Sequence, residues 1–269
     1  MNDDTPPVDG EADGIYGILL SDSLEGLPGT AADKVIVSGG HAGLRGVALA
    51  LAGGARALIA HDAGCASALG AVLEFATLHG LAMAIAGEGS CRPGDAADML
   101  QAGRICRVNP LALTLGIRPG VRVEDAAERL LLSPVPTARP AVPPLHRAVR
   151  TPPDARRPLV IVDDWPALTA DDAGAVVVCG APAVTSLLQA GPEPFAVLLH
   201  DGGLGPAGLH GLEGFPWPVA MIGGQDHAPG AAEDLLARGH LSAVNRRAGL
   251  FDLATGMDAV AAAARLCGN

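Results

Sequence analysis

Short apolar runs that end in glycine-rich polar turns recur along this chain. Two of them are Val35-Ile-Val-Ser-Gly-Gly-His-Ala-Gly43 and Ala57-Leu-Ile-Ala-His-Asp-Ala-Gly64. A continuous run of valine, isoleucine, leucine and alanine is typical of a parallel strand that is buried on both faces. The turn after such a strand lies at the carboxyl edge of the sheet, where ligands bind in open α/β sheets. The pattern therefore predicts an α/β fold with a functional site at that edge.

Segments of helical composition alternate with these runs through the first half of the chain. We expect strands over residues 15–20, 35–38, 57–60, 81–86 and 104–108, and helices over residues 44–52, 68–79, 95–102 and 123–132. The helix over 95–102 begins with acidic residues, which favour a helix start because carboxylates stabilise the positive end of the helix dipole. Residues 1–13 are acidic and lack periodicity, so we expect a disordered tail there.

A proline-rich segment divides the chain. Residues 133–158 contain eight prolines and five arginines, a composition that predicts a stiff and extended linker. We therefore expect a first α/β half over residues 14–132, which holds the main site. The Pro/Arg-rich linker over 133–158 joins it to a second, degenerate α/β half over 159–269.

The second half repeats the pattern of the first. The run Ala57–Gly64 matches Ala196-Val-Leu-Leu-His-Asp-Gly-Gly203, and the run Val35–Gly39 matches Val176-Val-Val-Cys-Gly180. Further matched positions are Asp22 with Asp163, Asp98 with Asp234, Gly103 with Gly239, Asn109 with Asn245, and Gly120 with Gly256. The spacing between matched positions is nearly constant over roughly 110 residues, which is the signature of an internal repeat.

This repeat predicts two homologous Rossmann-like βα halves with mainly parallel strands, related by a pseudo-two-fold internal duplication. The halves could face each other across a cleft or merge into one internal pseudo-dimer. Both arrangements are open, because docking two small halves buries apolar area that each half alone leaves exposed.

Composition and charge exclude several classes of protein. With 49% hydrophobic and 17% charged residues, the chain can bury a large core, and global disorder is not expected. The formal net charge of −11 argues against nucleic acid or an anionic membrane surface as the partner. The five cysteines show no C-x-x-C spacing, so we expect no metal and no cofactor. We see no signal peptide or membrane-spanning run, and we expect a cytoplasmic protein, with a homo-oligomer possible.

A His-Asp pair ends the matched strand in each half, as His61-Asp62 and His200-Asp201. A structural role is slightly favoured, because a feature kept in both copies is more often architecture than catalysis. A functional role in substrate binding stays open. A metal site shared by the two pairs is disfavoured, because adjacent side chains on a strand point to opposite faces.

The turn Ser38-Gly-Gly-His41 occurs only in the first half, since the second half has Cys179-Gly-Ala-Pro182. The backbone N–H groups of Gly39 and Gly40 can form an anion-binding concavity. His41 can then act as an acid or base near neutral pH. A tight turn with an incidental histidine is the alternative.

A third polar turn spans Gly87-Glu-Gly-Ser-Cys-Arg-Pro-Gly-Asp95. Arg92 is suited to hold a substrate carboxylate, because the guanidinium matches that group with two hydrogen bonds. Ser90 is a candidate nucleophile or substrate ligand, and Glu88 a candidate base. The alternative is that Arg92 pairs with Asp95 or with Asp98 at the start of the following helix. A thiolate at Cys91 activated by Arg92 is less favoured than a buried, inert cysteine.

Three motifs together resemble an uncharacterised family of bacterial proteins. They are Ser38-Gly-Gly-His-Ala-Gly43, His61-Asp-Ala-Gly64 and Ser90-Cys-Arg-Pro-Gly-Asp95, where the family has Ser-Gly-Ser-His-Gly-Gly, Asn-Asp-Ala-Gly and Ser-Ala-Arg-Ile-Gly-Asp. The resemblance covers about residues 20–130, and His61 departs from the asparagine of the family. It implies site residues at Ser38, His41, Asp62, Ser90, Arg92 and Asp95, and it implies no particular reaction.

These candidates predict an enzyme that acts on a small anionic molecule. A hydrolase acting on a carboxylate- or amide-bearing polar metabolite is slightly favoured, because serine, histidine and acidic side chains follow neighbouring strands. In this hypothesis His41 is the acid or base, and Asp62 orients it. The alternatives are a lyase or isomerase that uses the same pair of His41 and Asp62, and a non-enzymatic two-lobed protein that binds a small anion. The catalytic candidates are His41, Asp62, Ser38, Ser90 and Glu88, and the substrate-binding candidates are Gly39, Gly40, His61, Arg92, Asp95, His200 and Asp201.

Overall fold

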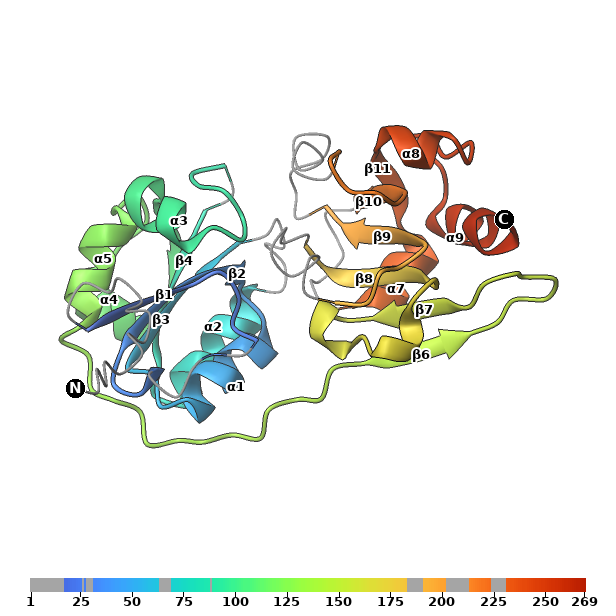
Figure 1. Cartoon of the computed structure of the whole chain (residues 1–269). Coiled ribbons are helices and arrows are strands. Elements are labelled where there is room, and N and C mark those ends of the chain that lie inside the picture. The colour runs from blue at the N-terminus through green and yellow to red at the C-terminus, as the bar shows by residue number, and fades with distance from the viewer. Residues whose placement is uncertain are drawn as a thin grey trace, which may run out of the picture.

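The structure is a computed structural model, and it describes residues 17–25, 27, 31–62, 69–87, 89–182, 191–201, 213–223 and 231–269. Each half of the chain forms its own mostly parallel β-sheet with helices between the strands (Figure 1). The predicted α/β fold with two similar halves is therefore confirmed. The two halves do not share one sheet.

The first sheet has the strand order β1-β2-β3-β4-β5. Its strands are β1 (Ile18–Ser21), β2 (Val35–His41), β3 (Ala57–His61), β4 (Ala82–Ala86) and β5 (Ile105–Val108). The first four strands pair in parallel, and β5 pairs with β4 antiparallel.

Helices cover both faces of this sheet. The helices α1 (Leu44–Ala52) and α2 (Leu69–Leu78) pack on one face, and α3 (Ala96–Ala102), α4 (Pro110–Thr114) and α5 (Val123–Leu130) share the core on the other. Ile36 and Leu58 point into the first of these cores, whereas Val37 and Ile59 point into the second. This burial on both faces explains why the strands read as continuous apolar runs.

The second sheet has the strand order β11-β10-β9-β8-β7-β6. Its strands are β6 (Arg147–Arg150), β7 (Leu159–Val162), β8 (Val176–Pro182), β9 (Ala196–His200), β10 (Val219–Gly223) and β11 (His240–Val244). Its helices are the 3₁₀ turns η2 (Trp165–Ala167) and η3 (Ala170–Asp172), followed by α7 (Ala232–Arg238), α8 (Arg246–Gly249) and α9 (Ala259–Gly268). The strands β7 to β10 are parallel, and β6 and β11 are antiparallel to their neighbours.

The strand β6 lies inside the segment that the sequence analysis expected to be linker. Its residues Arg147–Arg150 pair with β7, so the connection between the two sheets spans only residues 133–146. Three of its four residues are exposed, because β6 lies at the edge of the sheet. The sequence therefore offers no buried apolar run that would mark this strand.

Matched residues hold equivalent positions in the two halves. The buried side chain of Asn109 accepts backbone hydrogen bonds from Met83 of β4 and from Ala112 of α4, each at 3.0 Å, and its amide donates to Leu81. Asn245 makes the same three bonds in the second half. Each asparagine therefore connects the start of a strand to the start of a helix through its hydrogen bonds. This shared structural role explains why the sequence repeat has an asparagine at both positions.

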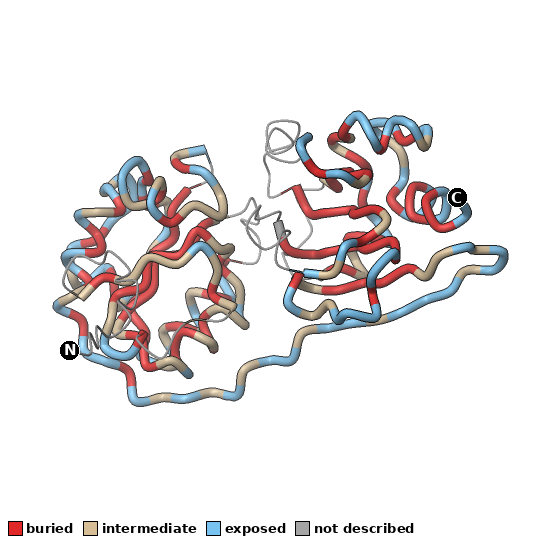
Figure 2. The backbone as a smooth tube through the Cα atoms, viewed as in Figure 1, coloured by how far each residue is buried: buried red, intermediate tan, exposed pale blue. Residues whose placement is uncertain are grey.

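The two halves lie side by side, and the connection runs along one flank of both (Figure 1). Buried strands form the centre of each half, whereas the connection is mostly half-buried or exposed (Figure 2). Among the described residues, no helix has the length and apolar character needed to cross a bilayer.

Replacing either asparagine should destabilise the fold. Asn109→Ala leaves two buried N–H groups and one carbonyl without their partner, and each such group costs free energy. We expect the free energy of unfolding to fall by about 3 kcal/mol in Asn109→Ala and similarly in Asn245→Ala. Urea denaturation measures this, with the exposed Asn269→Ala as the matched control. A loss as small as that of the control would contradict this role.

Candidate functional site

A cavity of about 360 Å³ lies where the first half meets the connection and the second half. This volume is within the range of small-molecule sites. Its lining consists of Ser23, Leu24, Glu25, Gly40, His41, Ala42, Gly43, Leu44, Arg45, Gly46, Ala71 and Val72 from the first half, Pro143, Pro144 and Leu145 from the connection, and Asp163 and Asp164 from the second half. The cavity is therefore lined by both halves and by the connection between them.

The ends of two equivalent strands, β1 in the first half and β7 in the second, contribute residues to this cavity. After β1, the carboxylate of Asp22 accepts a hydrogen bond at 2.9 Å from the backbone N–H of Ala96 at the start of α3. After β7, Asp163 accepts the equivalent bond from Ala232 at the start of α7, at 3.4 Å. The residues that follow each aspartate then line the cavity, and Asp164 is one of them.

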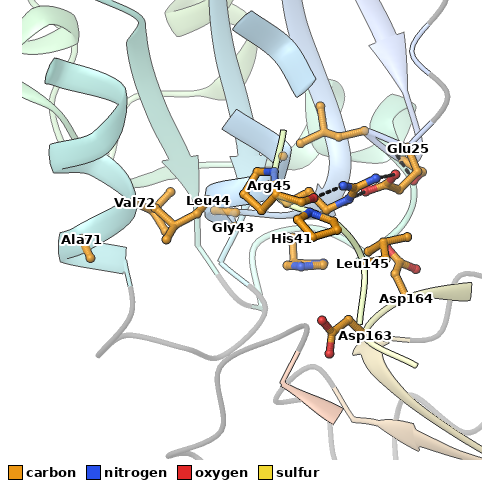
Figure 3. A pocket seen from close by; sticks show the side chains of 17 residues that line it. Glu25, His41, Gly43, Leu44, Arg45, Ala71, Val72, Leu145, Asp163 and Asp164 are labelled. Carbon is orange, nitrogen blue, oxygen red and sulfur yellow. Dashed lines mark hydrogen bonds and ion pairs between the residues drawn. The ribbon is translucent and has the colours of Figure 1, made fainter. Parts of the chain in front are cut away.

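His41 reaches the cavity through an irregularity in β2. The pairing register between β2 and β3 shifts between Ser38 and His41, so that His41 pairs with His61. Gly39 is required at this bulge, because a Cβ atom there would lie 2.5 Å from the backbone nitrogen of Asp95. The imidazole of His41 lies on one side of the cavity, with Asp163 and Asp164 on the other (Figure 3).

The environment of His41 disfavours its charged form. Burial is the main cause, and the neighbouring imidazoles of His200 and His61 add to it, so that the pKa of His41 falls to about 4. The imidazole is therefore neutral at neutral pH, whereas the sequence analysis expected it to titrate there. A neutral imidazole still carries one N–H donor and one acceptor nitrogen.

Asp164 shows the opposite shift. Burial raises the pKa of its carboxyl group to about 6, and the nearby carboxylates of Glu25 and Asp163 act in the same direction. The backbone N–H of Trp165, which donates to Oδ1 at 2.7 Å, and Arg45 oppose the shift only in part. The sequence analysis missed Asp164, although it adjoins Asp163 at a polar strand end.

Arg45 and Glu25 form a two-pronged ion pair at the cavity wall. Nε of Arg45 donates to Oε1 of Glu25 at 2.6 Å, and Nη2 donates to Oε2 at 2.8 Å. Nη1 of the same guanidinium donates to the backbone carbonyl of Pro143. Arg45 is the only cation among the described lining residues, and Glu25 already neutralises it. The sequence analysis missed both residues.

One of the two N–H groups of the predicted anion-binding turn, that of Gly40, is engaged within the protein. The backbone N–H of Gly40 donates to Oγ of Ser38 at 3.1 Å, and the carbonyl of Gly39 accepts from Gly94 at 2.8 Å. Ser38 itself is fully buried. Of these turn residues, Gly40 and His41 line the cavity, whereas Ser38 and Gly39 do not. The roles of Ser38, Gly39 and Gly40 stay predictions, which these contacts do not favour.

The third polar turn also lies away from the cavity lining. Oγ of Ser90 donates to the carbonyl of Gly87 at 2.7 Å and accepts from the N–H of Arg104 at 3.1 Å. Arg92 is 72% exposed and forms ion pairs with Asp98 at 3.0 Å and Asp95 at 3.2 Å. The alternative that the sequence left open, pairing of Arg92 at the helix start, is therefore the arrangement found.

Asp95 and Cys91 serve the same turn. Oδ1 of Asp95 accepts from the backbone N–H of Asp98 at 2.8 Å, which caps α3. Burial raises the pKa of the Cys91 thiol, so the nearby Arg92 does not activate it. Glu88, the candidate base, lies outside the described residues.

The His-Asp pairs occupy matched, buried strand ends. His61 and His200 are 0% and 2% exposed. His61 also forms a hydrogen bond with the backbone of Cys91, which only partly offsets the lowering of its pKa by burial. The backbone N–H of Asp62 donates to Ala86 at 2.9 Å, and that of Asp201 donates to Ile222 at 3.0 Å. These shared backbone bonds favour the structural reading of the pairs.

Asp62 faces β5. Its Oδ2 accepts a hydrogen bond from the thiol of Cys106 at 3.6 Å, and burial together with this carboxylate raises the pKa of Cys106 to about 11. The hydrogen bonds of the described residues include none between Asp62 and His41, so the orienting role of Asp62 stays a prediction. Within the described ranges, no group of three or more histidine, cysteine or acidic side chains is placed to hold a metal ion.

No protein-family model, curated protein or solved structure matches this chain. The resemblance to a bacterial family therefore stays a prediction.

The low pKa of His41 can be measured directly. We expect its imidazole carbon resonance to titrate near pH 4 in the folded protein, because burial and two neighbouring imidazoles disfavour the charged form. NMR titration, with His41→Gln to assign the signal and the exposed His240 as an internal reference, measures this value. Titration of His41 near its ordinary pKa of 6.5 would contradict the arrangement.

Proposed function

We propose that this chain is a small-molecule enzyme that moves protons in the cavity between its halves. Asp164 acts as the general base, and neutral His41 donates a hydrogen bond to a carbonyl oxygen of the substrate. The observation that carries this proposal is the pair of opposite pKa shifts in one cavity, to about 6 for Asp164 and about 4 for His41. Environments that push the pKa values of two groups apart are typical of acid–base sites.

The chemistry follows from these two groups. Asp164 is mostly ionised at neutral pH, yet it is a stronger base than an ordinary aspartate because its pKa is raised. It removes a proton from the carbon next to the carbonyl, and the electron pair of that C–H bond moves to form the enolate. The N–H of neutral His41 stabilises the negative charge on the enolate oxygen. In an isomerase that acts on a hydroxyketone, His41 gives its N–H proton to the former carbonyl oxygen and takes up the hydroxyl proton of the enediolate, and Asp164 returns its own proton to the former carbonyl carbon as the other oxygen becomes the carbonyl. In a lyase, the enolate re-forms the carbonyl while the bond between the next carbon and the leaving group breaks, and Asp164 gives its proton to that leaving group.

The contacts of the serines favour this chemistry over a serine-dependent hydrolase. Neither of the predicted serines, Ser38 and Ser90, lines the cavity, and the hydroxyl of each is engaged in hydrogen bonds within the protein. Ser23 does line the cavity, but its hydroxyl oxygen accepts a hydrogen bond from the backbone N–H of Glu25 at 3.1 Å, and no described hydrogen bond joins it to His41 or Asp164. An acyl intermediate needs a nucleophile within reach of the substrate and of a base. Hydrolysis remains a prediction from the sequence alone.

The lining favours a neutral polar substrate over an anion. Asp163, Asp164 and Glu25 present carboxyl groups, and the only cation among the described lining residues pairs with Glu25. An anionic group placed here would meet carboxylates and no free positive charge. A neutral metabolite with a carbonyl or amide group would meet hydrogen-bonding partners and apolar walls.

Exchange of substrate protons with solvent tests the proposal. The protein is incubated in D₂O with a panel of neutral hydroxyketones and amides, and deuterium uptake is followed by NMR. We expect exchange that falls by about 100-fold or more in Asp164→Asn and in His41→Gln. The rate should rise with pH through about 6, because the base must be ionised.

The matched controls are the exposed variants Asp171→Asn and His240→Gln, which should keep the wild-type rate. Equal exchange in Asp164→Asn and wild type would contradict the role of the base. Saturable binding of a panel member without any exchange or product would instead identify a two-lobed binding protein.

The stability of Asp164→Asn gives a test that is independent of the substrate. The pKa of Asp164 is higher in the folded state, about 6, than its ordinary value of 3.8, so its ionisation destabilises the folded protein as pH rises through 6. Asparagine removes that cost. We expect a gain in Tm for Asp164→Asn that is larger near about pH 8 than near about pH 4. A gain that does not depend on pH would contradict the raised pKa.

A further inference from the structure

The connection between the halves forms part of the cavity wall. Pro143, Pro144 and Leu145 line the cavity, although they belong to neither sheet. All three of His41, Leu145 and Asp164 line the cavity, and Figure 3 draws the side chain of Leu145 close to that of Asp164. Leu145 is half-buried, whereas both prolines are exposed. This short segment therefore lines the same cavity as the two ionisable groups, His41 and Asp164.

Both ends of the segment are held by hydrogen bonds. On the side of the first half, Nη1 of Arg45 donates to the carbonyl of Pro143. On the side of the second half, the backbone N–H of His146 donates to Asp163 at 3.1 Å, and the N–H of Asp163 donates to the carbonyl of His146 at 3.1 Å. Pro143, which carries the first anchor, and Pro144, which follows it, both have a fixed φ angle, so few backbone conformations can join the two anchors.

Arg45 is well placed to act as an anchor rather than as a substrate ligand. Glu25 takes two of its donors, and the side chains of Arg45 and Glu25 are only 27% and 14% exposed. The planar guanidinium can bind one carboxylate and one carbonyl in fixed directions at the same time, which an ammonium group on a flexible stem does not reproduce.

We propose that Arg45 is a positioning residue that fixes the connection through the carbonyl of Pro143, so that Leu145 closes the cavity over His41 and Asp164 and limits the size of the ligand. This proposal rests on the cavity of the proposed function, and it adds a determinant of specificity to it. Arg45 touches no reacting atom in this scheme. It keeps water away from the groups whose pKa values depend on burial.

The titration of His41 reports on this wall without any substrate. The first variant is Arg45→Lys, which keeps the positive charge but loses the planar guanidinium that binds Glu25 and Pro143 together. The second is Leu145→Ala, which changes no charge. We expect the pKa of His41 to rise from about 4 to about 5 or higher in both, because water then reaches the imidazole. The matched controls are Arg139→Lys, at an exposed arginine that donates to carbonyls of its own segment, and Leu132→Ala, at a leucine that is 78% exposed.

The outcomes separate the two proposals. Suppose that the pKa of His41 is near 4 in the wild type and stays unchanged in both Arg45→Lys and Leu145→Ala. This result overturns the proposed role of Arg45 and Leu145 in closing the cavity, and it leaves the proposed function intact. An ordinary pKa in the wild type contradicts the electrostatics of the proposed function itself. Far-UV circular dichroism of each variant confirms that the fold is kept.

The size limit has its own readout. Deuterium exchange into neutral hydroxyketones of increasing chain length is compared between the wild type and Leu145→Ala. We expect the ratio of long-chain to short-chain exchange rates to rise by about tenfold in Leu145→Ala, because removing the side chain enlarges the cavity. The same ratio in the variant and the wild type would overturn the role of Leu145 in specificity.

Discussion

Burial of side chains at the junction between the two halves is the constraint on which the proposed chemistry depends. Asp164 and His41 are ordinary side chains whose properties change because protein atoms replace their hydration. The ion pair of Arg45 and Glu25, the connection and the strand ends of both halves all line the cavity that holds these two groups. None of these elements is sufficient alone, because the cavity has walls from three separate parts of the chain.

The main features of the fold could be predicted from the sequence, because they are local. Strands buried on both faces give continuous apolar runs, and the repeated asparagines and glycines revealed the duplication. The strand β6 was missed because an exposed edge strand has no such run. The short helix α4 was also missed, although Asn109 caps it and Pro110 occupies its first turn.

The site was only partly predictable, because its main contacts join distant segments. His41 was identified from its glycine-rich turn, and it lines the cavity. Arg92 and Ser90 had the right chemistry, but local partners engage them. No motif marked Asp164, Glu25 or Arg45, since the roles proposed for them arise only when strand ends of opposite halves and the connection come together. The raised pKa of Asp164 is a property of that assembly and cannot be read from its neighbours in the sequence.

The connection over residues 133–146 also has a consequence for the evolution of the site. In a dimer of two identical chains, each residue at the junction would occur twice, and a change that introduced one carboxylate would introduce its symmetric copy as well. Covalent joining removes that restriction. Ser23 and Asp164 follow matched aspartates, and His41 matches Pro182, so the two copies have diverged where they meet. A single asymmetric site can therefore take its acidic group from one copy and its imidazole from the other.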